Sequence, residues 1–223
     1  MRIFASLMPV YYKDLPRSIA SLNQCIDGFH VDIMDDTYVP FCAGSLDLVS
    51  YLRSLSELPL WIHLMVHNPM PWIERLDCGP GGIISIHYEA YIDDLAGLLH
   101  ALVAIRAKGA QSSLVVSPDT SIEVVAGLVD YVDQLLIMGV IPGKSGQAML
   151  QGTRNRLEEL YRLRQEVDAP FLIGLDGGVS VESLAALSSC LPDDLAAATS
   201  IVFATAPCEV VNALRAVAKK AAI

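Results

Sequence analysis

The chain has 223 residues, of which 53% are hydrophobic and 18% charged, and its formal net charge is −10 at pH 7. This apolar fraction is enough for one domain to bury a large core. The negative charge argues against a nucleic-acid surface, because phosphate backbones are bound by clustered Lys and Arg. No apolar run approaches the roughly 18 residues of a membrane span. We therefore expect a single domain over residues 1–223, with neither a nucleic-acid nor a membrane partner.

The cysteines and the first residues bear on the cellular compartment. The chain has five scattered cysteines and no C-x-x-C pair: Cys25, Cys42, Cys78, Cys190 and Cys208. An odd, scattered set argues against a disulfide framework or a thiolate zinc site. Lys13 and Asp14 follow the start too soon for the apolar segment of a signal peptide. These features predict a cytoplasmic protein.

In chain order, short apolar runs alternate with longer segments that have apolar residues every three to four positions. The runs predict strands at residues 3–8, 29–34, 60–66, 82–87, 113–117, 134–140, 171–176 and 201–204. The longer segments predict helices, the clearest at residues 46–55, 93–108, 121–129, 150–167, 181–187 and 209–221. The runs are nearly continuous Ile, Val and Leu, which is typical of parallel strands buried on both faces.

This alternation predicts an α/β fold of the (β/α)8 type, the TIM barrel. Eight strand–helix units with short connections close naturally into a barrel. An open, doubly wound sheet is the competing architecture, but no G-x-G-x-x-G turn follows the first predicted strand. Because no linker or low-complexity tract interrupts the pattern, we expect one barrel domain.

Polar side chains occur at the carboxyl ends of the predicted strands, where barrel enzymes place their active residues. His30 and Asp32 are two residues apart, so they project from the same face of one strand. His63 lies on the next strand, and Asp176 ends the seventh. Any one of them alone is more simply a satisfied polar group. Together, two imidazoles and two carboxylates predict a site for zinc, iron(II), manganese or cobalt.

Longer motifs surround these four residues. Residues 30–41 read H-V-D-I-M-D-D-T-Y-V-P-F, residues 63–69 read H-L-M-V-H-N-P, residues 138–147 read M-G-V-I-P-G-K-S-G-Q, and residues 176–179 read D-G-G-V. Together they closely resemble the ribulose-phosphate 3-epimerase family, and the likeness runs over most of the chain. The resemblance implies a barrel of the ribulose-phosphate-binding type and an isomerase whose partner is a small phosphorylated ketose.

The resemblance also implies roles for the four polar residues. His30, Asp32, His63 and Asp176 correspond to the ligands of a divalent transition metal. Asp32 and Asp176 correspond to the acid/base pair that interconverts ribulose 5-phosphate and xylulose 5-phosphate. One carboxylate removes the proton beside the ketone, leaving a 2,3-enediolate, and the other returns a proton to the opposite face.

Further residues correspond to substrate contacts in the family. Met34, Met65 and Met138 match a trio beside the enediolate, where a polarisable surface excludes water, although each alone is equally explained as core filling. Ser6 and His63 match substrate-contacting positions. The phosphate is expected at three loops, whose matching residues are Gly143, Lys144, Ser145, Gly146, Gly177, Gly178, Thr205 and Ala206.

The loops over the barrel mouth depart from the family pattern. The departures are Asp36-Thr37 for a small residue and His, Phe41 and Ile141 each for Asn, Lys144 for Phe, Ser145 for Gly, and Thr205-Ala206 for a Gly-Ser pair. Lys144 either adds a cation for the phosphate or is a solvated loop charge. Because loops choose the substrate, another ketose phosphate, such as allulose 6-phosphate or a tetrulose phosphate, stays open.

The sequence disfavours three other functions. A decarboxylase on a related barrel carries D-x-K-x-x-D, but residues 32–35 read D-I-M-D, without the Lys. A non-catalytic sugar-phosphate binder has no need of paired carboxylates. An epimerase of unphosphorylated sugars usually carries Glu in place of Asp. We also expect a homo-oligomer, because apolar barrel exteriors often pair.

Overall fold

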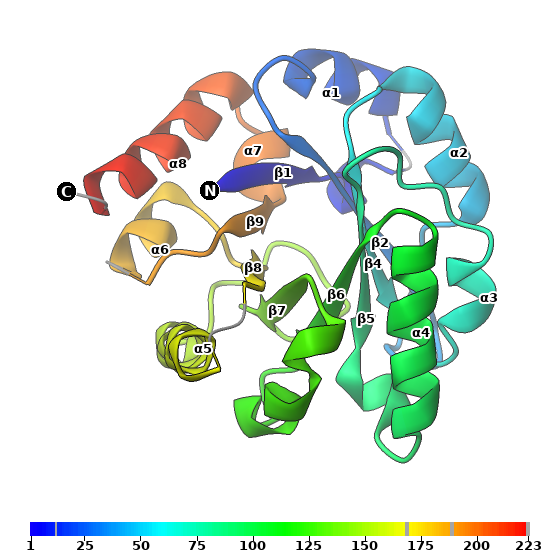
Figure 1. The fold of residues 1–223 in the computed structure, drawn as a ribbon. Helices are drawn as coiled ribbons and strands as arrows, with labels where there is room; N and C mark the ends of the chain where they lie inside the picture. Colours follow the sequence, from blue (N-terminus) through cyan, green and yellow to red (C-terminus); the bar gives the residue numbers. More distant parts are fainter. Residues whose placement is uncertain (12, 168–169, 188–189, 222–223) are drawn as a thin grey trace.

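In the computed structural model, described for residues 1–11, 13–167, 170–187 and 190–221, parallel strands close into a barrel (Figure 1). Its strands are β1 (Arg2–Ser6), β2 (Gly28–Asp35), β4 (Leu60–Met65), β5 (Ile83–His87), β6 (Gln111–Val116), β7 (Gln134–Met138), β8 (Leu172–Asp176) and β9 (Asp194–Ala197). The short β3 (Cys42–Ala43) runs antiparallel to the end of β2. Pairing of β1 with both β9 and β2 closes the sheet, so the predicted (β/α)8 barrel is confirmed.

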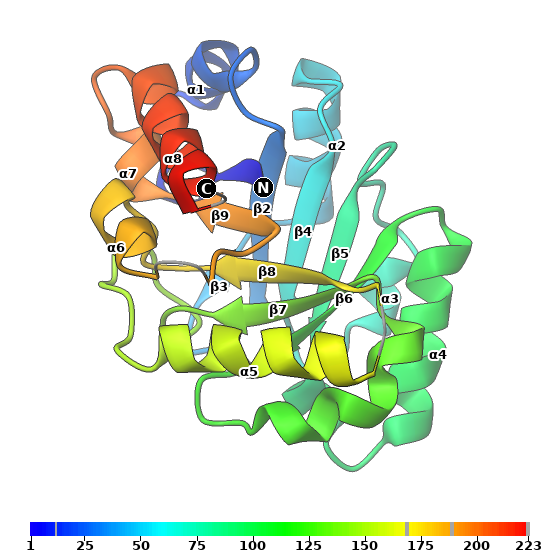
Figure 2. The same cartoon turned by 60° about the vertical axis from the view of Figure 1, so that its left-hand side comes forward.

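Helices surround the barrel on its outer side (Figure 2). They are α1 (Leu15–Leu22), α2 (Leu46–Leu55), α3 (Met70–Ile73), α4 (Leu95–Ala107), α5 (Thr153–Glu166), α6 (Val181–Ala186), α7 (Thr199–Val202) and α8 (Pro207–Ala221), with 3-10 helices η1 (Met8–Val10), η2 (Tyr88–Tyr91) and η3 (Ile122–Tyr131). The prediction at residues 46–55 matches α2, and the one at 121–129 falls on η3. Within the described ranges, no helix has the length and apolar character to cross a membrane.

The last predicted strand, residues 201–204, was wrong. That stretch begins inside α7, and the eighth barrel strand is β9, which is register-paired with β1 and β8. The error has a physical cause. Ile201, Val202 and Phe203 imitate a buried strand, whereas β9 reads D-L-A-A, with little of the β-branched character that marks strands.

Side chains fill the barrel interior from the amino ends of the strands to the middle, which leaves the site at the carboxyl ends. An inner apolar cluster occupies the middle and includes Phe4, Trp61 and Leu136. Beneath it, the fully buried Asp194 accepts hydrogen bonds from Arg2 at 2.6 Å and from Gln134 Nε2 at 2.7 Å. A separate apolar core packs the outer faces of the strands against the helices. This packing holds the strands in a fixed register.

One expectation about the cysteines is corrected. Cys25, after α1, and Cys208, in α8, form a disulfide across 183 positions of sequence. Barrel closure brings the first and last helices into contact, so cysteines that are remote in sequence become neighbours. Sequence spacing does not show this proximity. Cys42, Cys78 and Cys190 are free thiols.

Candidate metal centre and active site

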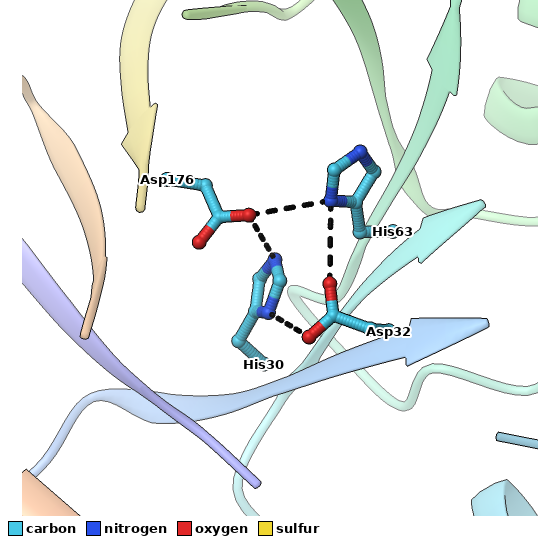
Figure 3. A group of neighbouring side chains, drawn as sticks. All are labelled: His30, Asp32, His63 and Asp176. Atoms are coloured by element: carbon cyan, nitrogen blue, oxygen red, sulfur yellow. Dashed lines mark ion pairs between the residues drawn. The ribbon is translucent and has the colours of Figure 1, made fainter. Parts of the chain in front are cut away.

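Strand register brings the four predicted ligands together at the barrel mouth (Figure 3). Asp32 on β2 lies directly beside His63 on β4. His30 projects from the same face of β2, two residues earlier, and Asp176 ends β8. One ligand atom from each residue lies within 4.8 Å of the others. The structure therefore assembles, from three strands, the cluster predicted from the sequence.

The spacing of these atoms suits a cation. His63 Nδ1 is 3.5 Å from Asp32 Oδ1 and 3.4 Å from Asp176 Oδ2. His30 Nδ1 is 3.5 Å from Asp32 Oδ2, and His30 Nε2 is 3.8 Å from Asp176 Oδ2. Both His30 nitrogens and His63 Nδ1 are buried with no hydrogen-bond partner among the described residues. Because buried polar atoms are normally satisfied, these unpartnered nitrogens and the two carboxylates fit a divalent transition metal.

The histidines and carboxylates of the cluster shift one another's pKa values. Burial by itself raises the pKa of Asp32, but the charge of His30 and the close approach of the His30 and His63 rings hold it well below its usual range. Burial likewise lowers the pKa of His63, but the nearby carboxylates of Asp176 and Asp32 raise it to about 9. Without a metal, a proton on His63 therefore balances the carboxylates. A metal ion bound by this cluster would take the place of that proton.

Residues outside the cluster hold Asp32 in place. The Ser6 hydroxyl donates to Asp32 Oδ2 at 3.2 Å. The Tyr11 hydroxyl accepts the backbone N–H of Asp32 at 2.6 Å and donates to its carbonyl oxygen at 3.2 Å. The sequence indicated Ser6 but not Tyr11, because nothing in a local pattern shows that a tyrosine 21 positions away returns to β2.

A cavity of about 560 Å³ opens over the cluster. This volume suits a small-molecule ligand. Asp32 and Asp176 line its floor, and the predicted residues Ser6, Met34, Met65 and Met138 also line it, together with Met8. His30 and His63 are fully buried and are not among the lining residues. The wall beside the carboxylates is thus rich in thioethers, which offer little competition for hydrogen bonds.

The loops after β7 and β8 form the opposite side of the cavity. The predicted residues Gly143, Lys144, Ser145, Gly146, Gly177 and Gly178 all line it. Gly178 has φ +68°, and a Cβ there would lie 2.5 Å from the backbone nitrogen of Met149, so only glycine fits. Among the described lining residues, Lys144 is the sole Lys or Arg. Its Nζ lies 5.1 Å from the centre of the Phe41 ring.

Thr205 and Ala206 are placed differently from the prediction. They lie between α7 and α8 and are not among the described residues that line the cavity. Ala198, Thr199 and Ser200, which follow the observed β9, line it instead. Because the last strand was predicted too late in the sequence, the expected phosphate contact was assigned to residues several positions after the observed strand end. Ser200 is tied to the neighbouring loop through a 2.7 Å hydrogen bond from its hydroxyl to the Val179 carbonyl.

His87 and Glu89 had no predicted role, yet both adjoin the cluster. His87 is fully buried, and its Nε2 lies 2.9 Å from Nε2 of His63. Burial and the nearby charge of His63 lower the pKa of His87 to about 4, against the effect of Glu89. Burial raises the pKa of Glu89, but hydrogen bonds, first from His87, lower it to about 2. The spacing of two residues, as in His30 and Asp32, was the available sequence signal.

The fold and the cluster define the class of protein: a (β/α)8 barrel with a mixed nitrogen–oxygen cluster at its mouth that could hold a metal. Residues 2–203 match the model of the "Ribulose-phosphate 3 epimerase family". The chain belongs to this family.

Curated relatives agree with this assignment. A ribulose-phosphate 3-epimerase of Aquifex aeolicus (strain VF5) is 31% identical over 166 residues, 74% of this chain and 73% of its own. That of Bacillus subtilis (strain 168) is 30% identical over 70% of this chain and 71% of its own. That of Mycobacterium tuberculosis (strain ATCC 25618 / H37Rv) is 27% identical over 96% and 91%.

Solved structures agree with the fold. The 3-hexulose-6-phosphate synthase of Salmonella typhimurium has a TM-score of 0.70 at 10% identity, covering 99% of this chain and 100% of its own. The 3-keto-L-gulonate-6-phosphate decarboxylase of Vibrio cholerae has a TM-score of 0.67 at 14% identity, covering 98% and 97%. At these identities the likeness concerns the barrel alone.

Proposed function

We propose that this chain is a metal-dependent 3-epimerase of a ketose phosphate, with ribulose 5-phosphate and xylulose 5-phosphate as its first candidate substrates. The observation that carries the proposal is the pair of carboxylates, Asp32 and Asp176, on the floor of a cavity above two buried imidazoles. The family and its curated relatives, named ribulose-phosphate 3-epimerase, support the same reaction.

His30, Asp32, His63 and Asp176 would hold the metal, and their donor set favours zinc, iron(II), manganese or cobalt. When bound, a divalent metal supplies positive charge that stabilises the negative charge developing on the substrate oxygens. The low pKa of Asp32 keeps this carboxylate ionised, which suits a base. The hydrogen bond from Ser6 orients the same carboxylate toward the cavity.

The proton moves between the substrate carbon and the two carboxylates. One of Asp32 and Asp176 removes the proton from C3, leaving a 2,3-enediolate, and the other delivers a proton to the opposite face, which inverts that carbon. Which carboxylate acts first depends on the epimer that is bound. Met34, Met65 and Met138 present thioethers that exclude water without protonating the enediolate.

The phosphate end of the substrate is assigned to the opposite side of the cavity. Gly177 and Gly178 line the cavity there, where backbone N–H groups would meet an anion, and Lys144 contributes a positive charge that its contact with Phe41 orients. Lys144, Ser145 and Thr199 add side chains to this side of the cavity. These side chains favour a second candidate substrate, another ketose phosphate such as allulose 6-phosphate, whose different length needs a reshaped anion site.

The test is incubation of the metal-loaded protein with a panel of ketose phosphates and unphosphorylated ketoses in deuterated water. NMR should show loss of the C3 proton signal and appearance of the epimer for at least one phosphorylated ketose. Exchange with no phosphorylated ketose, or only with a free sugar, would contradict the proposal. The rank order of the phosphorylated ketoses identifies the substrate.

The proposal also includes a homo-oligomeric assembly and a cytoplasmic location. Ile92, Leu95 and Val103 expose more than half of their surface on and beside α4, an apolar exterior that supports a homo-oligomer. Light scattering after size exclusion measures the oligomeric state. The Cys25–Cys208 disulfide argues against a cytoplasmic location, because disulfides are rare in that compartment. Thiol counting on protein from freshly lysed, alkylated cells decides this point.

A further inference from the structure

His87 lies behind the metal cluster, and the reaction described above makes no use of it. Its ring and that of His63 meet edge to edge, with centroids 5.0 Å apart and planes 19° from parallel. The two Nε2 atoms are 2.9 Å apart, a hydrogen-bonding distance. Because both partners are ring nitrogens, one must carry a proton and the other must not. The proton order, meaning which of the two Nε2 atoms carries the proton, therefore decides the tautomer of both rings.

The metal site determines that order. His63 Nδ1 faces Asp32 and Asp176, so it is the nitrogen on the cluster side. A nitrogen that binds a metal has no proton. A neutral His63 must then carry its proton on Nε2 and donate it to Nε2 of His87. Accepting this bond leaves His87 with its own proton on Nδ1.

The surroundings of His87 Nδ1 favour this arrangement. Glu89 Oε2 and Ser117 Oγ each lie 3.4 Å from that nitrogen. The second oxygen of Glu89 accepts the backbone N–H of Ser117 at 2.9 Å, and the Tyr38 hydroxyl donates to Oε2 at 3.3 Å. An ionised carboxylate only accepts hydrogen bonds. Glu89 therefore stabilises a proton on Nδ1 of His87.

We propose that His87 and Glu89 are positioning residues that select the metal-binding tautomer of His63. The Glu89 carboxylate keeps the His87 proton on Nδ1, so His87 Nε2 accepts from His63, and His63 Nδ1 stays unprotonated toward the metal. The inference rests on the proposed metal site and extends it by two residues. Ligand orientation by neighbouring hydrogen bonds is a general property of protein metal sites.

Glu89→Gln separates this role from simple packing. The Ser117 N–H requires an oxygen opposite it, so the glutamine oxygen faces Ser117 and its NH2 group faces His87 Nδ1. His87 Nδ1 must then accept, its proton moves to Nε2, and the proton of His63 is driven onto Nδ1. One atom is replaced, the shape is kept, and the proton order is reversed. Packing alone predicts no such reversal.

The first measurement is the zinc dissociation constant of metal-stripped protein, by competition with a chromophoric chelator. Glu89→Gln should bind zinc about 10- to 100-fold more weakly than the wild type. Tyr38→Phe and Ser117→Ala are matched controls. Each removes one hydroxyl of the group around Glu89 and His87, but keeps the aromatic ring or the Ser117 backbone N–H, so each should stay within about threefold of the wild type.

The second measurement needs no variant. Long-range 1H–15N spectra of the zinc-loaded wild type should show His63 protonated at Nε2 and His87 protonated at Nδ1. A proton on Nε2 of His87, or a Glu89→Gln variant that folds and binds zinc as tightly as the wild type, would overturn the inference. A wild type that binds no zinc would instead refute the proposed metal site, so the two failures are distinguishable.

Discussion

The two sides of the cavity are built in different ways. The metal cluster stands on β2, β4 and β8, whose residues are register-paired and buried. The side assigned to the phosphate stands on the loops that follow β7 and β8 and on the residues after β9, where side chains such as Lys144 are exposed. The strands place the cluster atoms within 4.8 Å of one another. The loops instead position backbone groups and the positively charged side chain of Lys144.

In the proposed function, the strands carry the residues that perform the reaction, and the loops carry the residues that select the substrate. A change of one residue in strand register moves a side chain to the other face, so the cluster tolerates little variation. Loops accept new side chains more readily, and it is the loops of this chain that depart from the family pattern. The comparison predicts that changes in the cluster abolish turnover and that changes on the loop side alter affinity.

The largest effect is expected at the carboxylates. Asp32→Asn and Asp176→Asn should each lower kcat by about 10²- to 10⁴-fold, because an amide neither takes up nor returns the proton at C3. Steady-state kinetics and deuterium incorporation at C3 measure the loss. Thermal unfolding serves as the control, since both variants should retain a folded barrel. Either variant retaining more than about a tenth of wild-type turnover would break the comparison.

Metal affinity should depend on pH through His63. Its pKa in the metal-free protein is raised to about 9, so below that pH the metal must displace a proton. Apparent zinc affinity should therefore rise by up to about tenfold for each pH unit between 6.5 and 8.5, and level off above 9. Chelator competition at several pH values measures the slope. An affinity that falls as the pH rises would show that another ligand set holds the metal.

Lys144→Ala tests the loop side. Loss of a charge-assisted hydrogen bond to phosphate should raise KM about tenfold and leave kcat nearly unchanged. Lys13→Ala is the matched control, because Lys13 also lies over an aromatic ring, 5.2 Å from the centre of Phe203, but does not line the cavity. Equal kinetics for the two variants would mean that Lys144 is a solvated loop charge.

The smallest effect on catalysis is expected at the disulfide. Replacing Cys25 and Cys208 together with serine should leave kcat and KM unchanged, because neither residue lines the cavity. The same variant should lose about 2–4 kcal/mol of unfolding free energy, since the disulfide closes a long loop. Denaturant unfolding measures the change. A drop in kcat without a loss of stability would connect this remote surface to the site.

Strand-borne residues were the easier part of the molecule to predict. The period of two along β2 placed His30 and Asp32 on one face, and the barrel hypothesis brought Asp176 near them. The D-L-A-A segment of β9 escaped prediction because its strand character comes from pairing with both neighbours rather than from its own side chains. Thr199 and Ser200 were missed for the same reason.

Contacts across the chain were the harder part. The meeting of His87 with His63 depends on the neighbouring positions of β5 and β4, and the Cys25–Cys208 pair depends on closure of the barrel. Both arise from tertiary packing between residues far apart in sequence. The family resemblance contributed the roles of the residues, and the structure contributed their distances.

Anomalous X-ray scattering from zinc-loaded crystals tests the central claim most directly. We expect one zinc ion per chain at the barrel mouth, with His30, Asp32, His63 and Asp176 each contributing an atom at about 2.0–2.2 Å. A zinc ion elsewhere, or a barrel mouth that stays empty at saturating zinc while the protein turns over substrate, would contradict it.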